Sequence, residues 1–585
     1  RWYAAASVLR CSPLSRALYF SGKYEMFERI KLKFGSAVTE DPLDLLVTPI
    51  TVFVGPNNSG KSKILKEILH FCREGSLDAR GVIIEEAVLE NIEEQKFNEK
   101  LSHLEKEPNE HESLPEGNMI VGNYQERIQI RKENLTQSIG QVNNGHFRQW
   151  FCQWFLKFNT LLLDGQGRMQ LAREQQGGNL QSAPHNSLSA LFRDDEKRAE
   201  VRRIVHDAFG LHFVIDPTDL GKLKVRLSEK APSNEMQERG VHADAVEFHS
   251  KAKKIDELSD GVKAFTGIVL ELVAGDPMVL MVDEPEAFLH PSLSYKLGKE
   301  VSVTASAQSK NIFVSTHSSN FIMGCVQSGV PINIVRLTYS QGAATARLLP
   351  DEKLLQLMRN PLLRSTGVID GLFYEAVIVT ESDADRAFYQ EINERLLRHS
   401  PERGISNCLF INAQNKQTVH QIIKPLRELG IPAVAIVDVD ILKEGGQVWS
   451  NFLSSGFVPQ ISQTPLGSIR QAIKQKFSEL AIDMKRDGGI SSLPNDEKEA
   501  AENLLNQLKE YGLFVVPNGE LECWLKNLEA SGHGPKWLVE IFEKMGENPD
   551  LDDYVKPETG DVWDFIGSIK EWTSSVNRKG IPAKI

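Results

Sequence analysis

The chain has 585 residues, 41% of them hydrophobic and 25% charged, and its net charge is −12. This composition is ordinary for a globular protein, and the length indicates several domains rather than one hydrophobic core. Because the chain as a whole repels phosphate, any nucleic acid must bind to a local basic surface or through bound cations.

Six cysteines are scattered singly along the chain: Cys11, Cys72, Cys152, Cys325, Cys408 and Cys523. Without a C-x-x-C pair, neither a disulfide framework nor a zinc site is indicated, and a reduced cytoplasmic compartment is expected. No uninterrupted apolar run approaches the roughly 20 residues of a membrane helix, so no membrane partner is expected. Residues 1–23 contain no acid. Two interpretations of them stay open, a transit-peptide-like bias and an extension outside the fold.

A strand, a glycine-rich loop and a helix follow one another early in the first expected domain, residues 24–370. Residues 27–35 alternate like a strand, and ITVFVG, residues 50–55, indicates a short buried strand. The loop GPNNSGKS matches G-x-x-x-x-G-K-[ST], and the next residues, KILKEILHF, have helical spacing. Strand, loop and helix are the context that this motif requires.

This loop predicts a nucleotide site. Its N–H groups and the helix N-terminus would cradle phosphates, Lys61 would reach the β- and γ-phosphates, and Ser62 would hold Mg²⁺. The alternative is a chance glycine-rich turn. The predicted nucleotide-binding residues of the loop are Gly55, Asn57, Asn58, Ser59, Gly60, Lys61 and Ser62.

A helical insertion is expected at residues 70–200. Eleven acids and three lysines lie between Glu85 and Glu116, which is typical of a solvated helical segment. The Gly-, Gln-, Asn- and Ser-rich stretch from Gly165 is expected to be a loop, and residues 194–210 a surface helix.

The second half of the predicted nucleotide site lies about 220 residues farther on. An apolar strand ends in Asp283, which can coordinate Mg²⁺ through water, and Glu284, which can polarise the attacking water. Upstream, ELSDGVKAF contains Ser259 and Gly261, and downstream the strand NIFVST is followed by His317. Taken alone, Ser259 and Gly261 fit a helix cap, and His317 fits a buried core histidine.

Together these segments resemble the ABC-type ATPase head. Its signature loop, LSGGQ in transporters, reads LSDGV here, close to the form in DNA-repair relatives. The resemblance implies that Ser259 and Gly261 contact the γ-phosphate of a nucleotide held by another subunit, and that His317 is the switch histidine. A homodimer or higher homo-oligomer is therefore expected. The glutamine-bearing loop of these heads has three candidates: Gln125, Gln166 and Gln170.

The second expected domain, residues 371–585, is also α/β. AVIVTE, CLFINA and AVAIVDVD are apolar strands separated by helical stretches, which indicates a parallel sheet with helices on both faces. A helical insertion is expected at residues 443–510.

Three acids are predicted to meet at the carboxyl edge of this sheet. Glu381 ends one strand, and Asp438 and Asp440 end another. On an extended strand end, two residues that are two apart leave the same face. Crowded carboxylates repel one another, and divalent cations remove that cost, so a Mg²⁺ (or Mn²⁺) site suited to phosphodiester chemistry is expected. The alternative is that each acid is an ordinary turn residue.

This arrangement resembles the TOPRIM domain of topoisomerases, primases and certain nucleases. That family has a strand-end glutamate, a following helix and a later strand-end D-x-D. It usually has Gly directly after the glutamate, whereas this chain has Ser382. Ser382 and Asp385 also fit a capping box, so Asp385 has two possible roles, as a cap and as a catalytic metal ligand in the family's E-x-x-x-D spacing. Asp383 is expected to be a solvated helix-start acid.

Two further groups are candidates for the same site. Glu520 and Glu522 follow another strand and are expected either to complete a second metal site or to begin a helix. Lys579 and Lys584 are candidates for steadying the charge that develops on phosphate, although C-terminal lysines are more often solvated.

An ABC-type head followed by a TOPRIM domain resembles the OLD (overcoming lysogenization defect) family of nucleases. In that family the insertion in the head helps to form the dimer, so the resemblance implies this role for residues 70–200. The resemblance implies an ATP-binding, metal-dependent DNA endonuclease that acts in bacterial anti-phage defence, sometimes with a partner protein or retron nucleic acid. Its implied catalytic residues are Glu381, Asp385, Asp438, Asp440, Glu284, Lys579 and Lys584. Three alternatives remain: a recombination-repair-type ATPase that binds DNA without cutting it, a topoisomerase or primase, and a clamp that ATP only locks.

Overall fold

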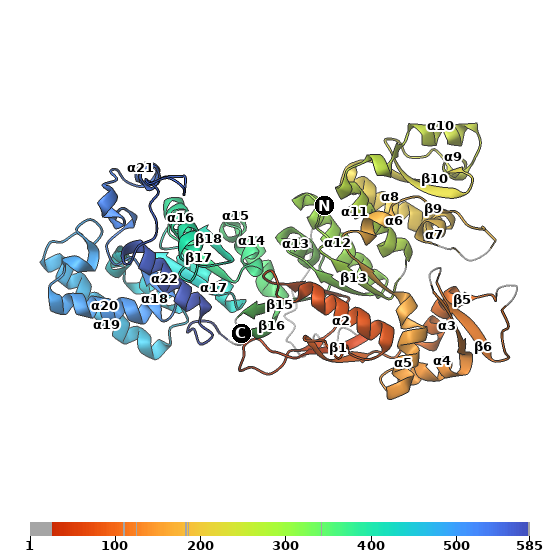
Figure 1. Ribbon diagram of the computed structural model, residues 1–585, viewed down its shortest axis with the longest axis horizontal. Coiled ribbons are helices and arrows are strands. Elements are labelled where there is room, and N and C mark those ends of the chain that lie inside the picture. The colour runs from red at the N-terminus through yellow and green to blue at the C-terminus, as the bar shows by residue number, and fades with distance from the viewer. Residues whose placement is uncertain are drawn as a thin grey trace, which may run out of the picture.

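The computed structural model describes residues 26–108, 112–123, 126–181, 184, 186–275, 277–340 and 342–582. Residues 1–23, Gln125 and Lys584 lie outside this range. The molecule is elongated, and two α/β units follow each other along its long axis (Figure 1). No described helix is long and apolar enough to span a membrane.

The first unit is built on a six-stranded sheet with the order β16-β15-β3-β14-β13-β8. Five strands are parallel, and the edge strand β16 is antiparallel. The strands are β3 (Ile50–Val54), β8 (Thr160–Leu163), β13 (Val279–Asp283), β14 (Asn311–Ser315), β15 (Ile332–Ser340) and β16 (Ala343–Leu349).

The central strand β3 is fully buried because both faces of the sheet are covered. Ile50, Val52 and Val54 pack into one core, whereas Phe53 packs on the opposite face with Ile64 of helix α2 (Lys61–Glu74). The strand therefore delivers the glycine-rich loop to the carboxyl edge of the sheet, where open α/β sheets bind ligands.

The insertion expected at residues 70–200 is helical only in part. The segment contains helices α3 (Glu94–Leu104) and α5 (Gly145–Trp154), but also strand β4 (Ile84–Leu89) and the small sheet β5-β6-β7 (Glu105–Lys106, Asn118–Gly122, Arg127–Arg131), and it returns to the central sheet as β8. The acids of β4 are paired across the sheet with β1 (Phe27–Leu32): Glu85 with Lys31 and Glu86 with Arg29. Partners more than 50 residues away do not appear in a local pattern.

The expected loop from Gly165 is also only partly a loop, because helix α6 (Gly167–Leu171) lies within it. Helix α6 packs against α11 (Asp260–Leu270), and a Cβ on Gly267 would lie 1.8 Å from the carbonyl oxygen of Arg168. This close approach of the two helix backbones depends on tertiary packing, so the polar composition of the stretch from Gly165 does not predict it.

The second unit has a four-stranded parallel sheet with the order β18-β17-β19-β20. The strands are β17 (Ala376–Thr380), β18 (Cys408–Asn412), β19 (Ala433–Val437) and β20 (Leu513–Val515), and they are accompanied by helices α16 (Asp383–His399), α17 (Val419–Glu428) and α22 (Asp561–Ser574). Between β19 and β20 lie α18 (Gly446–Ser455), α19 (Gln460–Glu479) and α20 (Asn495–Lys509), at the far end of the molecule in Figure 1.

The two units share a continuous hydrophobic core. Helices α14 (Asp351–Arg359) and α15 (Pro361–Ser365) connect the units, followed by the 3₁₀ helix η5 (Val368–Phe373). One buried cluster contains Val314 of the first sheet, Leu354 and Leu372 of the connection, and Ile431 before β19. The units are therefore packed against each other rather than joined by a free linker.

Candidate active sites

The glycine-rich loop joins β3 to α2 in a conformation that only glycine accepts at key positions. Gly55 and Gly60 have φ values of 141° and 98°, and a Cβ on Gly55 would lie 2.0 Å from the carbonyl oxygen of Leu337. Lys61 begins the helix, and its Nζ donates to the carbonyl oxygens of Gly55 and Pro56 at 2.9 and 2.7 Å. Burial lowers the pKa of Lys61 to about 8.

The residues predicted to hold Mg²⁺ in this unit are in direct contact. The Ser62 hydroxyl donates to Oδ1 of Asp283 at 2.9 Å, and the Ser315 hydroxyl donates to the same oxygen. Asp283 ends β13, and Ser315 ends the neighbouring parallel strand β14. The sheet register therefore brings these three side chains to one edge, although more than 200 residues separate Ser62 from the others.

Glu284 and His317 face each other beside this contact. Glu284 has a φ of 51°, and its Oε1 lies 3.7 Å from Nε2 of His317. The buried Arg168 of α6 donates to the carbonyl oxygens of Asp283 and Glu284 at 3.2 and 2.7 Å. Arg168 was not predicted from the sequence, because it lies in the polar stretch from Gly165 that was expected to be a loop.

Glu286 also belongs to this site and was missed. Its Oε1 accepts from the backbone N–H of His317 at 2.6 Å, and burial raises the pKa of its carboxyl. Its position two residues after Glu284 was the only sequence signal.

Ser259 and Gly261 lie at the start of α11. Ser259 occupies the N-cap position but makes no side-chain cap bond, and it is exposed. A Cβ on Gly261 would lie 2.6 Å from the carbonyl oxygen of Phe288. Among the described residues, no hydrogen bond joins Ser259 to the glycine-rich loop.

Of the glutamine candidates, Gln166 is the one directly after a strand of the central sheet. It follows β8, whose Leu163 pairs with Val282 of β13. Gln170 lies within α6.

In the second unit, the three predicted carboxylates meet. Glu381 follows β17, Asp438 and Asp440 follow the adjacent parallel strand β19, and one oxygen of each lies within 4.8 Å of the others. Oε1 of Glu381 accepts from the backbone N–H of Asp438 at 2.9 Å. The extended strand end that was expected at Asp438 and Asp440 is wrong, because β19 ends at Val437 and a 3₁₀ helix, Val439–Lys443, begins there.

Burial and mutual repulsion perturb this cluster strongly. Burial, with the charge of Asp438, raises the pKa of Glu381 to about 8, and burial raises the pKa of Asp438 to about 7. Oδ1 of Asp440 is buried and has no hydrogen-bond partner among the described residues. A buried carboxylate oxygen without a partner is costly, and hard oxygen ligands of this kind suit Mg²⁺ or Mn²⁺, so the residues fit a divalent cation.

Lys485, which sequence analysis missed, lies among these acids. Its Nζ is 2.6 Å from Asp438, 3.5 Å from Glu520 and 3.8 Å from Asp440. A second lysine, Lys416, contacts Asp440 at 2.8 Å. Lys485 lies between α19 and α20, where the sequence around it offers no motif.

The prediction for Lys579 is wrong. Its Nζ pairs with Glu510, and it lies over the ring of Tyr511. Both residues precede β20, so they lie at the amino edge of the parallel sheet, opposite the carboxylates. Lys584 lies outside the described residues.

Asp385 forms the capping box with Ser382. Its Oδ2 accepts from the backbone N–H of Ser382 at 2.9 Å and from the hydroxyl at 2.8 Å. Burial raises the pKa of Asp385, and its charge in turn raises the pKa of Glu381 and Asp438, so it lies beside the cluster as well. Asp383 is exposed and pairs with Arg386.

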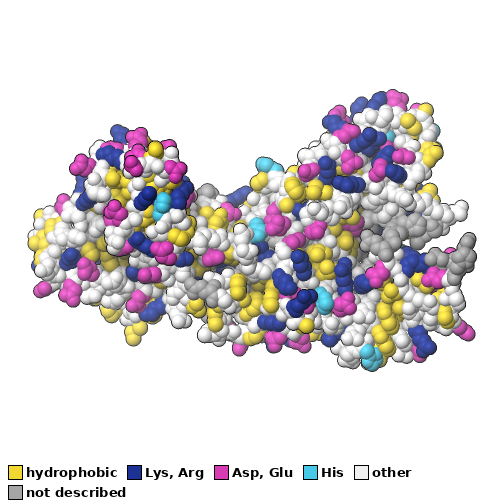
Figure 2. Space-filling model, in the orientation of Figure 1, with side chains coloured by type: hydrophobic (Ala, Val, Ile, Leu, Met, Phe, Trp, Pro, Cys, Tyr) yellow, Lys and Arg dark blue, Asp and Glu magenta, His cyan; other side chains and the backbone are white. Residues whose placement is uncertain are grey.

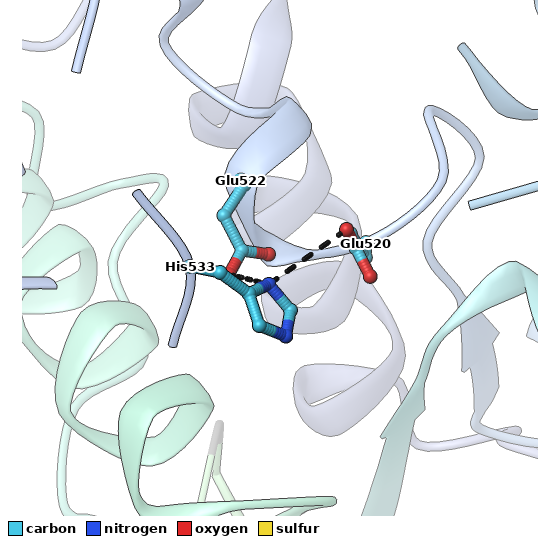
Figure 3. A group of neighbouring side chains, drawn as sticks. All are labelled: Glu520, Glu522 and His533. Carbon is cyan, nitrogen blue, oxygen red and sulfur yellow. Dashed lines mark ion pairs between the residues drawn. The ribbon is translucent and has the colours of Figure 1, made fainter. Parts of the chain in front are cut away.

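Glu520 and Glu522 gather with a residue that sequence analysis missed, His533. Its Nδ1 lies 2.7 Å from Glu522 and 4.0 Å from Glu520, and Figure 3 shows the ring facing the two carboxylates. All three offer ligand atoms within 4.8 Å of one another. Because Lys485 also contacts Glu520, this group adjoins the first carboxylate cluster.

Comparison with known families gives two matches in sequence order. Residues 182–323 match a family described as "AAA domain, putative AbiEii toxin, Type IV TA system". Residues 372–440 match the "Overcoming lysogenization defect protein-like, TOPRIM domain" family. The second match contains Glu381, Asp438 and Asp440, and the first contains Asp283 and His317.

The chain has the domain arrangement of an OLD family nuclease. The α/β fold predicted from the sequence, a P-loop ATPase unit followed by a TOPRIM unit, is thereby confirmed. No curated protein matches the chain.

Solved structures that are similar to this chain include head domains of SMC proteins. An SmcHead bound to the C-winged helix domain of ScpA is 14% identical, with a TM-score of 0.33 over 57% of this chain and 99% of that one. An SMC head domain from Thermotoga maritima is 13% identical, with a TM-score of 0.28 over 56% and 99% of the two chains. A third, from Pyrococcus furiosus, is 13% identical, with a TM-score of 0.30 over 57% and 98%.

Proposed function

We propose that this protein is an ATP-binding, divalent-metal-dependent DNA endonuclease of the OLD type that acts in bacterial anti-phage defence. The observation that supports this most directly is the convergence of Glu381, Asp438 and Asp440 at the carboxyl edge of the TOPRIM sheet. The orphaned oxygen of Asp440 and the raised pKa of Glu381 indicate that this cluster is built for a positive ligand.

In this proposal Glu381, Asp438 and Asp440 hold the cation, with Asp385 as a neighbouring acid. When bound, a divalent cation there supplies charge neutralisation and Lewis acidity for phosphodiester hydrolysis. Lys485 replaces Lys579 in its predicted role, because its Nζ lies against Asp438 and can donate to a phosphate oxygen. Glu520, Glu522 and His533 provide a second set of ligands next to the first.

Substrate DNA must be attracted by positive side chains near the site, because the chain as a whole is negatively charged. The net charge is −12, and acidic and basic side chains are interspersed over the face shown in Figure 2. Phosphate contacts by Lys485 and Lys416 would place the DNA backbone beside the carboxylates, since both lysines already contact Asp440.

The ATPase unit is proposed to bind Mg²⁺ and ATP through the loop at residues 55–62, Asp283 and His317, with Glu284 positioned for hydrolysis and Gln166 as the glutamine of the site. Ser259 is exposed and has no hydrogen bond to this loop among the described residues, which supports its use by a second copy of the chain. ATP binding between two copies would then control access to the nuclease units.

Plasmid cleavage tests the nuclease assignment. Supercoiled plasmid incubated with Mg²⁺ or Mn²⁺ should be nicked or linearised, and the double change Asp438→Ala and Asp440→Ala should abolish this. Nicking that survives the double change would contradict the assignment, and DNA binding without cleavage by the intact protein would favour a repair-type ATPase instead. Running each reaction with and without ATP shows whether the nucleotide activates or restrains cleavage.

A further inference from the structure

A cavity of about 260 Å³ lies where the ATPase and TOPRIM units meet. Strands β15 and β16 contribute Arg336, Thr338 and Arg347 to its wall, the start of β17 contributes Glu375, and the segment after α22 contributes Arg578. The loop at residues 55–62 and the three catalytic carboxylates do not line it. Glu375 precedes β17, so the cavity lies at the amino edge of the TOPRIM sheet, opposite the nuclease site.

The three arginines of this cavity bond to backbone carbonyl groups only. Arg336 donates to Leu372 and Tyr374, at 3.2 and 2.7 Å, and Arg347 donates to Pro582 at 2.8 Å. Arg578 donates to the carbonyl oxygen of Thr573 at 3.0 Å. None of the three guanidinium groups forms an ion pair with a carboxylate in the described part of the chain.

Uncompensated charge is unusual at this degree of burial. Arg336 is only 4% exposed. Burial, with the neighbouring charges of Arg347 and Arg578, lowers its pKa to about 9. Nε of Arg578 is buried and has no hydrogen-bond partner among the described residues. Buried charges are normally paired, because an unpaired one costs several kcal/mol. Glu375 also lines the cavity and opposes the lowering of the Arg336 pKa, but no ion pair joins it to any of the three arginines in the described part of the chain. The wall therefore carries three guanidinium groups against one carboxylate.

We propose that this cavity binds a small phosphate-bearing anion, either inorganic phosphate or the phosphate group of a nucleotide. Guanidinium groups match phosphate oxygens with two parallel hydrogen bonds. The hydroxyls of Thr338 and Thr345 hydrogen-bond to each other in the wall, which leaves one of the two as a neutral donor. The volume lies just below the usual range for drug-sized ligands, which suits a small anion rather than a strand of nucleic acid.

An anion in this cavity would tie the two units together. It would touch the edge of the ATPase sheet and the base of the TOPRIM sheet at once. Leu337 lies between the lining residues Arg336 and Thr338, and its carbonyl oxygen is the atom that a Cβ on Gly55 would meet. The residue between these two lining residues therefore touches the start of the nucleotide loop.

Calorimetric titration of the full chain tests the proposal. The chain carries Lys61→Ala, which weakens phosphate binding by the loop at residues 55–62, so that the titration reports on the cavity. Inorganic phosphate and AMP are titrated separately, and the tighter binder identifies the source of the phosphate group. Arg578→Gln and Arg347→Gln are each expected to weaken binding roughly 10-fold or more, as loss of a charge-assisted pair does. Lys579→Ala is the matched control, because this neighbour pairs with Glu510 outside the cavity, and it should leave binding unchanged.

Melting temperatures without ligand show whether each variant folds, and Arg578→Lys keeps the charge if a glutamine variant fails. The proposal is overturned if folded Lys61→Ala protein binds neither anion, or if binding is indifferent to the changes at Arg347 and Arg578. Displacement of phosphate by a single-stranded oligonucleotide in an Arg578-dependent manner would assign the cavity to nucleic acid and would also overturn it.

Discussion

Lys485 brings a positive charge into the acidic cluster of the proposed nuclease site. It contacts Asp438, Asp440 and Glu520, whereas Lys579, a candidate from the sequence, lies at the opposite edge of the sheet. No motif identifies Lys485, because its role depends on a helical segment folding back over β19 and β20. Glu381 and Asp438 were predictable, since strand ends of a parallel sheet meet at one edge.

Replacing Lys485 with Ala should reduce plasmid cleavage roughly 10²-fold, as the loss of one donor to a developing charge does. Lys485→Arg should retain part of the rate. Lys579→Ala provides the control and should cleave like the unchanged chain. Equal rates for the two alanine variants would remove Lys485 from the proposed site.

Cation binding at the TOPRIM site should depend on pH. The pKa of Glu381 is raised to about 8 in the folded chain without metal, so folding favours its protonated form. That contribution to stability is full below the pKa of the unfolded chain and is lost as the pH rises through about 8. A cation must displace the proton, so Mn²⁺ affinity should increase from about pH 6 to about pH 8 and then level off.

Calorimetry in two buffers of different ionisation enthalpy measures the protons that Mn²⁺ binding releases. Release should be largest near pH 6, should fall as the pH rises through about 8, and should be smaller in Glu381→Gln. An affinity that is flat over this pH range in the unchanged chain would contradict the assignment of Glu381 as a ligand.

At the scale of elements, helix α16 combines a structural and a chemical role at its start. Ser382 stands where the TOPRIM family usually has glycine, and with Asp385 it forms a complete capping box. The cap was predictable because it depends on residues three apart. The proximity of Asp385 to Glu381 was implied only by the resemblance to the TOPRIM family, because it depends on how the helix leaves the sheet.

Two variants separate these roles. Ser382→Ala should lower the free energy of unfolding by about 1 kcal/mol, the usual cost of an N-cap, and leave most of the cleavage activity. Asp385→Asn keeps an oxygen that can accept from the N–H of Ser382, so it should change the melting temperature less but cleavage more. Melting curves and plasmid assays on both variants measure the two effects. If Asp385→Asn protein cleaves plasmid at the normal rate, Asp385 has only the capping role.

At the scale of the whole molecule, the exposed position of Ser259 leads us to predict that ATP brings two copies of the chain together. Glu284→Gln, which should bind ATP without hydrolysing it, is expected to shift the mass in solution to that of a dimer or larger when ATP is added. Adding Ser259→Arg should prevent the shift by blocking the surface that faces the second nucleotide. Light scattering after size exclusion measures the mass, and Lys61→Ala is the control that should not respond to ATP. A mass that ignores ATP in Glu284→Gln would contradict ATP-driven pairing.

The sequence by itself determined the features that depend on neighbouring residues: the strand–loop–helix around Lys61, the acids at the ends of β13, β17 and β19, and the cap at Ser382. Local spacing suffices for these, because strands and helices impose fixed periods on the chain. Only the tertiary structure decided the rest. Lys485 joins Asp438, His533 joins Glu522, and Arg336, Arg347 and Arg578 converge on one cavity. These contacts arise from the packing of elements distant in sequence, so no local pattern carries them.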